Sequence, residues 1–178
     1  MKFTELEIPG VWLIEARKFG DARGYFMESF KKEVFESHVG KVNFLQDNES
    51  KSSYGVLRGL HFQRGEMAQA KLVRAIVGSV LDVVVDIRKD SPTYGKHIAV
   101  ELSEDNATQL FIPRGLAHGF VVLSDTAIFG YKVDNVYAPQ SEACLLATDP
   151  ALGIDWRVPS DKCLMSDKDM IGSLLVDL

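Results

Sequence analysis

Along most of the chain, apolar and polar residues alternate with the period of two that separates the two faces of a β-strand. Runs with this alternation, together with apolar runs of strand length, cover residues 11–14, 71–77, 81–88, 98–102, 110–112, 121–123 and 127–133. Glycine, proline and polar residues separate the runs. Short strands punctuated in this way predict an antiparallel sandwich or barrel, so the expected fold class is all-β.

Two segments depart from the alternation. Residues 29–38 place apolar side chains at helical spacing, which predicts one short helix ending at an exposed His38. Residues 139–178 have scattered apolar positions, which predicts a loop-rich C-terminal tail packed on the barrel. No βαβ alternation and no glycine-rich phosphate loop occur, so residues 1–178 are expected to form a single domain with few short helices.

The run GVLRGLHFQ at 55–63 mixes charged and polar groups into an apolar strand pattern. In an extended strand His61 and Gln63 share one face, whereas Arg58 joins that face only if Gly59 lies in a β-bulge. A buried imidazole is costly unless its ring nitrogens are hydrogen-bonded. From this stretch alone, a satisfied core histidine and a functional one are equally good interpretations.

Composition limits the possible partners and compartments. With 178 residues, 46% of them hydrophobic, the chain can bury a core, and its net charge of −5 disfavours nucleic acid without excluding a cationic pocket. Cys144 and Cys163 lack metal-type spacing and are expected to be free thiols in a reducing cytoplasm. Glu5 and Glu7 interrupt the N-terminus, so no signal peptide is expected, and no apolar run reaches the length of a membrane span.

Four polar residues lie within apolar strand patterns: His61, Lys71, His118 and Tyr131, with Asp82 on the polar side of its own strand. A base, a cation and a phenol inside a barrel can move protons next to a carbonyl group. The alternative for Lys71 is a solvated edge-strand lysine, and for Tyr131 a core residue with a satisfied hydroxyl.

A metal site is the competing functional interpretation, because two histidines in a small β-barrel are typical of a mononuclear metal bound by histidine and carboxylate. Such sites usually carry two histidines close together on one strand. Here Gln63, a poor ligand, stands two residues after His61, and the sequence contains no His-x-His. This disfavours the metal interpretation without removing it.

Several motifs resemble the dTDP-4-dehydrorhamnose 3,5-epimerase family. They are DARG at 21–24, QDN at 46–48, GVLRGLHFQ at 55–63, GSVLDVVVDIR at 78–88, LFIPRGLAHGF at 110–120 and SDKD at 166–169. The resemblance runs over nearly the whole chain in the same order. It implies a cupin-like jelly-roll barrel that dimerises by strand exchange, and cofactor-free, metal-free epimerisation at carbons 3 and 5 of dTDP-4-dehydro-6-deoxy-D-glucose, on the way to dTDP-L-rhamnose.

The family's catalytic set matches four residues of this sequence. The resemblance implies that His61 is the base, Asp169 the carboxylate that orients it, Tyr131 the acid and Lys71 the group that stabilises the enolate. The carboxylate is expected to fix the tautomer of His61 and raise its basicity. Lys71 is expected to favour the phenolate of Tyr131.

The resemblance also implies a set of substrate contacts. Two arginines suit a diphosphate through their fork geometry, two acids and a lysine are placed at the nucleotide end, and Tyr137 is expected to stack on the thymine ring. The complete set is Arg23, Phe26, Glu28, Gln46, Asp47, Asn48, Arg58, Lys71, His118, Tyr137, Glu142 and Lys168.

Two places depart from the family pattern. Ala143-Cys144 stands where a glycine is more usual, and Gly172 where a proline is expected. Relatives that invert only one carbon keep the same catalytic set, so the sequence leaves that alternative open. A non-catalytic sugar-binding jelly roll is a second alternative, but it would have no need for His61, Lys71 and Tyr131 together.

Overall fold

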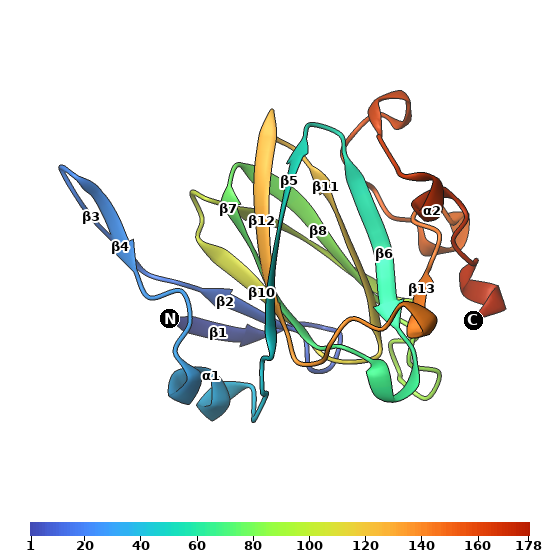
Figure 1. The fold of residues 1–178 in the computed structure, drawn as a ribbon, viewed down its shortest axis with the longest axis horizontal. Coiled ribbons are helices and arrows are strands. Elements are labelled where there is room, and N and C mark those ends of the chain that lie inside the picture. Colours follow the sequence, from blue (N-terminus) through green and yellow to red (C-terminus); the bar gives the residue numbers. More distant parts are fainter.

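The computed structural model describes residues 1–178 as two facing antiparallel β-sheets with a projecting hairpin (Figure 1). The first sheet has the order β1 (Lys2–Glu5), β2 (Trp12–Glu15), β10 (Thr108–Ile112), β7 (Lys71–Val77), β12 (Thr126–Val133) and β5 (Gln46–Ser53). The second has the order β13 (Glu142–Cys144), β6 (Leu57–Gln63), β11 (Leu116–Val122), β8 (Ser79–Asp86) and β9 (His97–Ser103). This architecture confirms the predicted all-β jelly-roll barrel.

The main core lies between the two sheets. Val73 and Phe129 of the six-stranded sheet pack against Val84 and Phe120 of the five-stranded sheet, and the rings of Phe120 and Phe129 stack with centroids 4.2 Å apart. Full burial of such side chains contributes about 1.5–3 kcal/mol each. The same inward-facing positions carry polar residues nearer one end of the barrel, and these form the site described below.

A β-bulge in β6 brings Arg58 to the inner face. In the pairing of β6 with β11, His61 lies opposite His118 and Arg58 opposite Phe120, so two residues of β6 match one of β11. Gly59 occupies the bulge with φ +123°, and a Cβ there would lie 2.6 Å from the Cα of Gly119. The close approach of the two backbones therefore requires glycine, and the conditional prediction of a bulge is confirmed.

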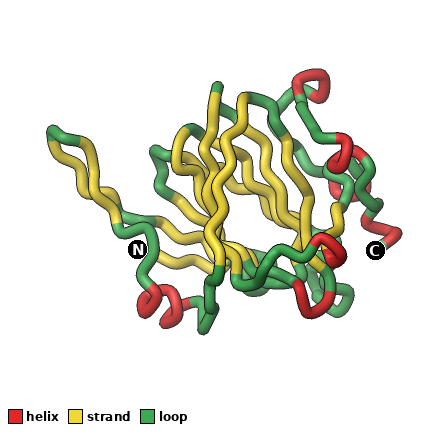
Figure 2. Tube along the Cα trace, in the orientation of Figure 1, coloured by secondary structure: helices red, strands yellow, loops and turns green.

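The C-terminal tail covers the outer face of the five-stranded sheet. Trp156, Leu152 and Leu145 from the tail pack against Leu81 and Val83 of β8, which is why both faces of that strand are buried. The tail contains four 3-10 helices and one α-helix: η2 (Pro139–Ser141), η3 (Pro150–Leu152), η4 (Ser160–Lys162), η5 (Leu175–Asp177) and α2 (Asp167–Met170). The tail thus packs on the barrel as the sequence predicted (Figure 2).

The predicted helix is present but shorter. α1 spans Lys32–His38, and its Phe35 packs edge-on against Phe111 on the outer face of the six-stranded sheet, with centroids 5.2 Å apart. Ser29 is outside the helix because its carbonyl accepts a hydrogen bond of 2.7 Å from the Gln109 side chain. His38 is exposed, as predicted. The remaining helix, η1, covers only Gly65–Met67, and no helix of the structure is long and apolar enough to cross a membrane.

The hairpin formed by β3 (Lys18–Asp21) and β4 (Gly24–Met27) stands apart from both sheets. Its strands pair only with each other, and the hairpin points away from the barrel (Figures 1 and 2). The chain reverses at Ala22-Arg23, between Gly20-Asp21 at the end of β3 and Gly24 at the start of β4. Phe26 on this hairpin is 71% exposed, which leaves an apolar surface without a partner in the same chain.

Candidate active site

A cavity of about 290 Å³ opens between the sheets at one end of the barrel. The structure brings seven of the predicted site residues to its wall: Gln46, Asn48, His61, Lys71, Tyr131, Tyr137 and Glu142. Residues from both sheets contribute because the alternation of β5, β6, β7 and β12 turns these side chains inward. The sequence pattern did not indicate Gln63 and Gln69 as wall residues, although the parity of Gln63 pointed to the same face.

His61 is hydrogen-bonded to a carboxylate 108 residues further along the chain. The distance from His61 Nε2 to Asp169 Oδ1 is 2.5 Å, and the side chain of Asp169 is only 6% exposed. Ser166, the N-cap of α2, donates its hydroxyl to Asp169 Oδ2 at 2.8 Å and so fixes the carboxylate. With Nε2–H donated to Asp169, the lone pair resides on Nδ1, which suits His61 to accept a proton.

The environment of His61 sets its protonation state. Burial lowers the pKa of the imidazole, and the charge and hydrogen bond of Asp169 oppose this shift without reversing it. The expectation that the carboxylate raises the basicity of His61 is confirmed, but the net pKa of the ring is still lowered. The physical reason is that desolvation of the imidazolium outweighs one ion pair. His61 is neutral at pH 7 and can act as a base.

Lys71 supplies a positive charge at the cavity wall. Its ammonium donates to the carbonyl oxygen of His61 at 3.4 Å. Burial lowers the pKa of Lys71 to about 8, and the carboxylates of Asp82 and Glu142 oppose the shift. The group is thus still mainly charged at neutral pH. In a partly desolvated cavity such a charge can stabilise a developing oxyanion far better than it would in water.

Tyr131 approaches the cavity from the opposite sheet to His61, because it belongs to β12 of the six-stranded sheet. Burial raises the pKa of its phenol, and the charge of Arg58 partly opposes that shift. Arg58, brought inward by the β6 bulge, is therefore the cation that acts on Tyr131. Lys71 lines the same cavity as Tyr131, and its predicted effect on the phenolate after proton transfer stays a prediction.

His118 and Asp82 form a second histidine–carboxylate pair inside the barrel. His118 Nε2 lies 2.8 Å from Asp82 Oδ2, and both side chains are almost fully buried. Burial lowers the pKa of His118, with Asp82 opposing the shift. His118 was expected to contact substrate, but its side chain is buried and does not line the cavity. The alternation along its strand predicted that Asp82 faces inward, but no sequence pattern predicted that it pairs with His118.

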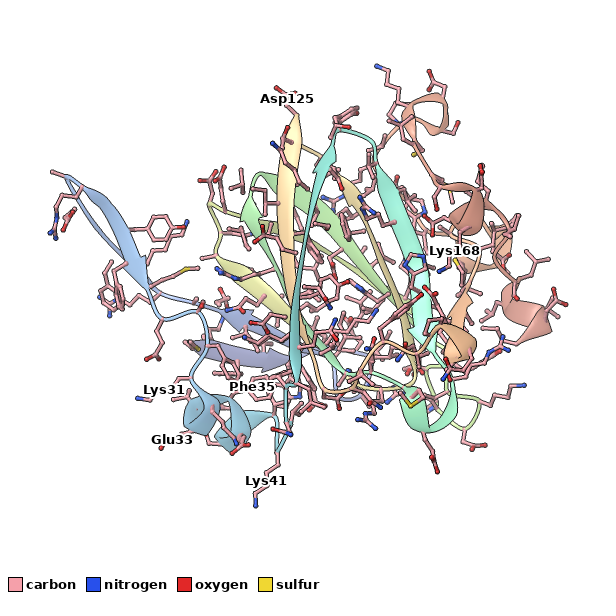
Figure 3. The ribbon with its side chains drawn as sticks, in the orientation of Figure 1. Lys31, Glu33, Phe35, Lys41, Asp125 and Lys168 are labelled. Carbon is pink, nitrogen blue, oxygen red and sulfur yellow. The ribbon has the colours of Figure 1, made fainter.

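The rim of the cavity carries the residues expected at the nucleotide end. Glu142 on β13 accepts a hydrogen bond of 2.6 Å from the hydroxyl of Tyr137 and forms an ion pair with Lys168 of α2. Lys168 lies where α2 packs against β6 (Figure 3). Because Lys168 directly precedes Asp169, the same short helix connects the rim to the carboxylate that holds His61.

Besides His118, five predicted contacts lie away from the cavity wall. Asp47 was expected to bind substrate, but it faces the outer surface of the six-stranded sheet and pairs with Lys132 at 2.9 Å. The period of two explains this, because Gln46 and Asn48 take the inner face. Arg58 is on the inner face of β6 but outside the cavity wall, where its side chain is exposed and its Nε donates to Ser52 Oγ at 3.1 Å. The other three, on or just after the projecting hairpin, are Arg23, Phe26 and Glu28.

Comparisons with known proteins agree with this geometry. A family model described as dTDP-4-dehydrorhamnose 3,5-epimerase matches residues 5–177. The chain is 54% identical to the dTDP-4-dehydrorhamnose 3,5-epimerase of Shigella flexneri, over 99% of this chain and 97% of that protein. The chain belongs to the dTDP-4-dehydrorhamnose 3,5-epimerase family.

Solved structures of similar epimerases have the same fold. The enzyme of Legionella pneumophila, in complex with dTDP-4-keto-L-rhamnose, is 44% identical with a TM-score of 0.94, covering 98% of this chain and 93% of that one. A 3'-monoepimerase of Streptomyces bikiniensis, in complex with dTDP-quinovose, is 35% identical with a TM-score of 0.89, covering 96% and 86%. Both kinds of epimerase thus share this architecture.

The pKa shifts predict a bell-shaped dependence of kcat/KM on pH for this epimerase. Activity should rise as His61 loses its proton, below the usual histidine value of about 6.5. It should fall as pH rises through about 8, because Lys71 then loses the proton that makes it cationic. Tyr131 stays protonated over this range because its pKa is raised.

The variant Lys71→Arg is the control for this assignment. Arginine keeps its charge far above pH 8, so the variant should lose the falling limb near pH 8 even if its maximal rate is lower. Measurement of kcat/KM against pH for both proteins gives the result. A falling limb that stays near pH 8 in Lys71→Arg would assign it to another group.

Proposed function

We propose that the chain epimerises carbons 3 and 5 of dTDP-4-dehydro-6-deoxy-D-glucose to give dTDP-4-dehydro-L-rhamnose, with His61 as base and Tyr131 as acid. One observation carries this proposal: a histidine held by Asp169 and a tyrosine reach one cavity from opposite sheets. Inversion of a carbon requires removal of a proton from one face and delivery to the other. Two groups on opposite walls meet that requirement.

The steps follow from the chemistry of the substrate. The ketone at carbon 4 acidifies the hydrogens on carbons 3 and 5. His61 takes one of these protons, and the electron pair moves onto the ketone oxygen to form an enolate. Lys71 stabilises the enolate oxygen, and Tyr131 donates a proton to the opposite face of the carbon. Side-chain acid–base chemistry accounts for the whole sequence, so the proposed reaction needs no metal and no cofactor.

The wall and rim residues suit a nucleotide diphosphate sugar. Gln46 and Asn48 offer amide groups on the inner face of β5. Arg58, outside the wall beside Ser52, offers a guanidinium that can bind phosphate oxygens. Tyr137 is more than half exposed at the rim, where its ring can stack on a base. Glu142 and Lys168 beside it can hydrogen-bond the same end of the ligand.

Incubation with the 4-keto sugar nucleotide in deuterated water tests the reaction. NMR should show deuterium at both carbon 3 and carbon 5, together with inverted product. A single-carbon epimerase is the second candidate, favoured by the similarity to the Streptomyces bikiniensis 3'-monoepimerase. Inversion at only one carbon would support that candidate, and absence of any exchange would contradict both.

We also propose that two copies form a homodimer in which the β3–β4 hairpin of each chain reaches the cavity of the other. The hairpin carries Arg23, Phe26 and the following Glu28 out into solvent, away from the cavity of its own chain (Figure 1). Arg23 contacts only Asp21 within the chain, in an exposed ion pair of 2.5 Å. Exposed ion pairs are weak, so Arg23 is free to exchange Asp21 for a phosphate.

Complementation between two impaired variants tests the crossed arrangement. Arg23→Ala should lose roughly 10–100-fold in kcat/KM if the guanidinium bonds a phosphate, and His61→Asn should lose the base. In co-assembled dimers of the two variants, one site regains both residues. Random pairing should therefore restore about a quarter of the wild-type activity. No gain on co-assembly, or a monomer by light scattering, would contradict the proposal.

We propose a cytoplasmic location because neither of the two cysteines forms a disulfide. Cys144 and Cys163 are both free thiols in the structure, as is usual for proteins of reducing compartments. Fractionation of cells that express the native chain would test the location. Recovery in an extracytoplasmic fraction would contradict it.

A further inference from the structure

Cys144 places a thiol next to the histidine–carboxylate pair of the active site. It lies directly opposite His61 in the pairing of β13 with β6, so the two side chains share a face. The Sγ atom of Cys144, a ring nitrogen of His61 and a carboxylate oxygen of Asp169 all lie within 4.8 Å of one another. These are three ligand types that bind zinc and its softer relatives.

We propose that this cluster is an inhibitory site for Zn²⁺ and similar soft divalent cations, in which His61, Cys144 and Asp169 are the protein ligands. The inference rests on the proposed role of His61 as the base. Three protein ligands with a fourth, open position are the usual arrangement of an accessible zinc site. The side chain of His61 is 33% exposed toward the cavity, which leaves that fourth position to water or substrate.

Small movements are enough to admit the ion. Nitrogen and oxygen ligands of a tetrahedral zinc lie about 3.3 Å apart, and nitrogen and sulfur ligands about 3.6 Å. His61 Nε2 and Asp169 Oδ1 are now 2.5 Å apart, so the carboxylate has to withdraw by roughly 0.8 Å as its shared proton leaves. The thiol, within 4.8 Å of the ring nitrogen, has to approach by at most about 1.2 Å.

Metal binding removes the base by a defined proton balance. The ion takes the lone pairs of the Cys144 thiolate, the Asp169 carboxylate and His61 Nε2. The thiol proton leaves to solvent, and the ring proton moves from Nε2 to Nδ1. The lone pair on Nδ1 that accepts the substrate proton is then lost. Zinc should therefore stop enolate formation without blocking the nucleotide end of the cavity.

Cadmium and zinc titrations of two alanine variants test the site. The protein is first treated with chelator, and Cd²⁺ binding is followed by sulfur-to-metal charge-transfer absorbance while Zn²⁺ binding is followed by calorimetry. Wild type and Cys163→Ala, the matched control, should bind one ion per chain with a thiolate signal. Cys144→Ala should lose that signal and bind Zn²⁺ more than about tenfold more weakly, since even a group supporting a metal ligand is worth about 10–100-fold.

Activity provides the second readout. Chelator-treated wild type should be fully active. Zn²⁺ should inhibit wild type and Cys163→Ala but not Cys144→Ala, and Cys144→Ser replaces Cys144→Ala if the alanine variant does not fold. Equal zinc binding by wild type and both Cys144 variants would overturn the inference, as would stoichiometric binding that leaves exchange into the substrate unchanged. If the chain proved to lack epimerase activity, the absorbance titration would still decide whether the site exists.

Discussion

Replacement of His61 by asparagine is expected to lower kcat by at least about 10²–10⁴-fold, the typical contribution of a general base. Asparagine is similar in size and can still donate a hydrogen bond to Asp169, so the cavity should keep its shape. It cannot accept a proton near neutral pH. Because one base serves both carbons, deuterium exchange at carbons 3 and 5 should fall together.

The matched control for this substitution is His38→Asn. His38 lies on the exposed end of α1, outside the cavity wall, so the same chemical change there should leave kcat and exchange unaltered. Thermal unfolding of both variants would confirm that any loss is not a loss of folding. Persistent exchange at either carbon in His61→Asn would require a second base.

Replacement of Tyr131 by phenylalanine is expected to separate proton removal from proton delivery. The change removes only the hydroxyl, and the ring can keep its packing beside Phe129, whose centroid is 6.4 Å away. His61 should still form the enolate, and Lys71 should still stabilise it. Without an acid on the opposite face, His61 returns the proton to the face from which it came.

The variant Tyr131→Phe should therefore exchange deuterium into recovered, uninverted substrate while inverted product falls by about 10²–10⁴-fold. Tyr54→Phe is the control, because Tyr54 is an exposed tyrosine outside the cavity wall. NMR of the recovered sugar measures both quantities in one sample. Product formation near the wild-type rate would exclude Tyr131 as the acid, and loss of exchange together with product would assign it to binding or enolate formation.

The sequence by itself determined the facing of side chains along single strands. Alternation correctly turned His61 and Gln63 to one side of β6, and Lys71 and Tyr131 to the inside of β7 and β12. It also turned Asp47 away from Gln46 and Asn48, even though the resemblance grouped the three together. The face of the sheet to which a side chain points can be predicted from the sequence, because it depends only on the two-residue period of the strand backbone.

Strand pairing and tail packing decided what the sequence left open. The register of β6 against β11 forced the bulge that brings Arg58 inward, and the packing of α2 against β6 delivered Asp169 to His61. Burial between the sheets then lowered the pKa of His61, although the charge and hydrogen bond of Asp169 raise it. His61 and Asp169 are 108 residues apart in the sequence, so their contact depends on which surfaces of the fold pack together. The desolvation that lowers the pKa of His61 depends on the same packing, and no local sequence pattern encodes it.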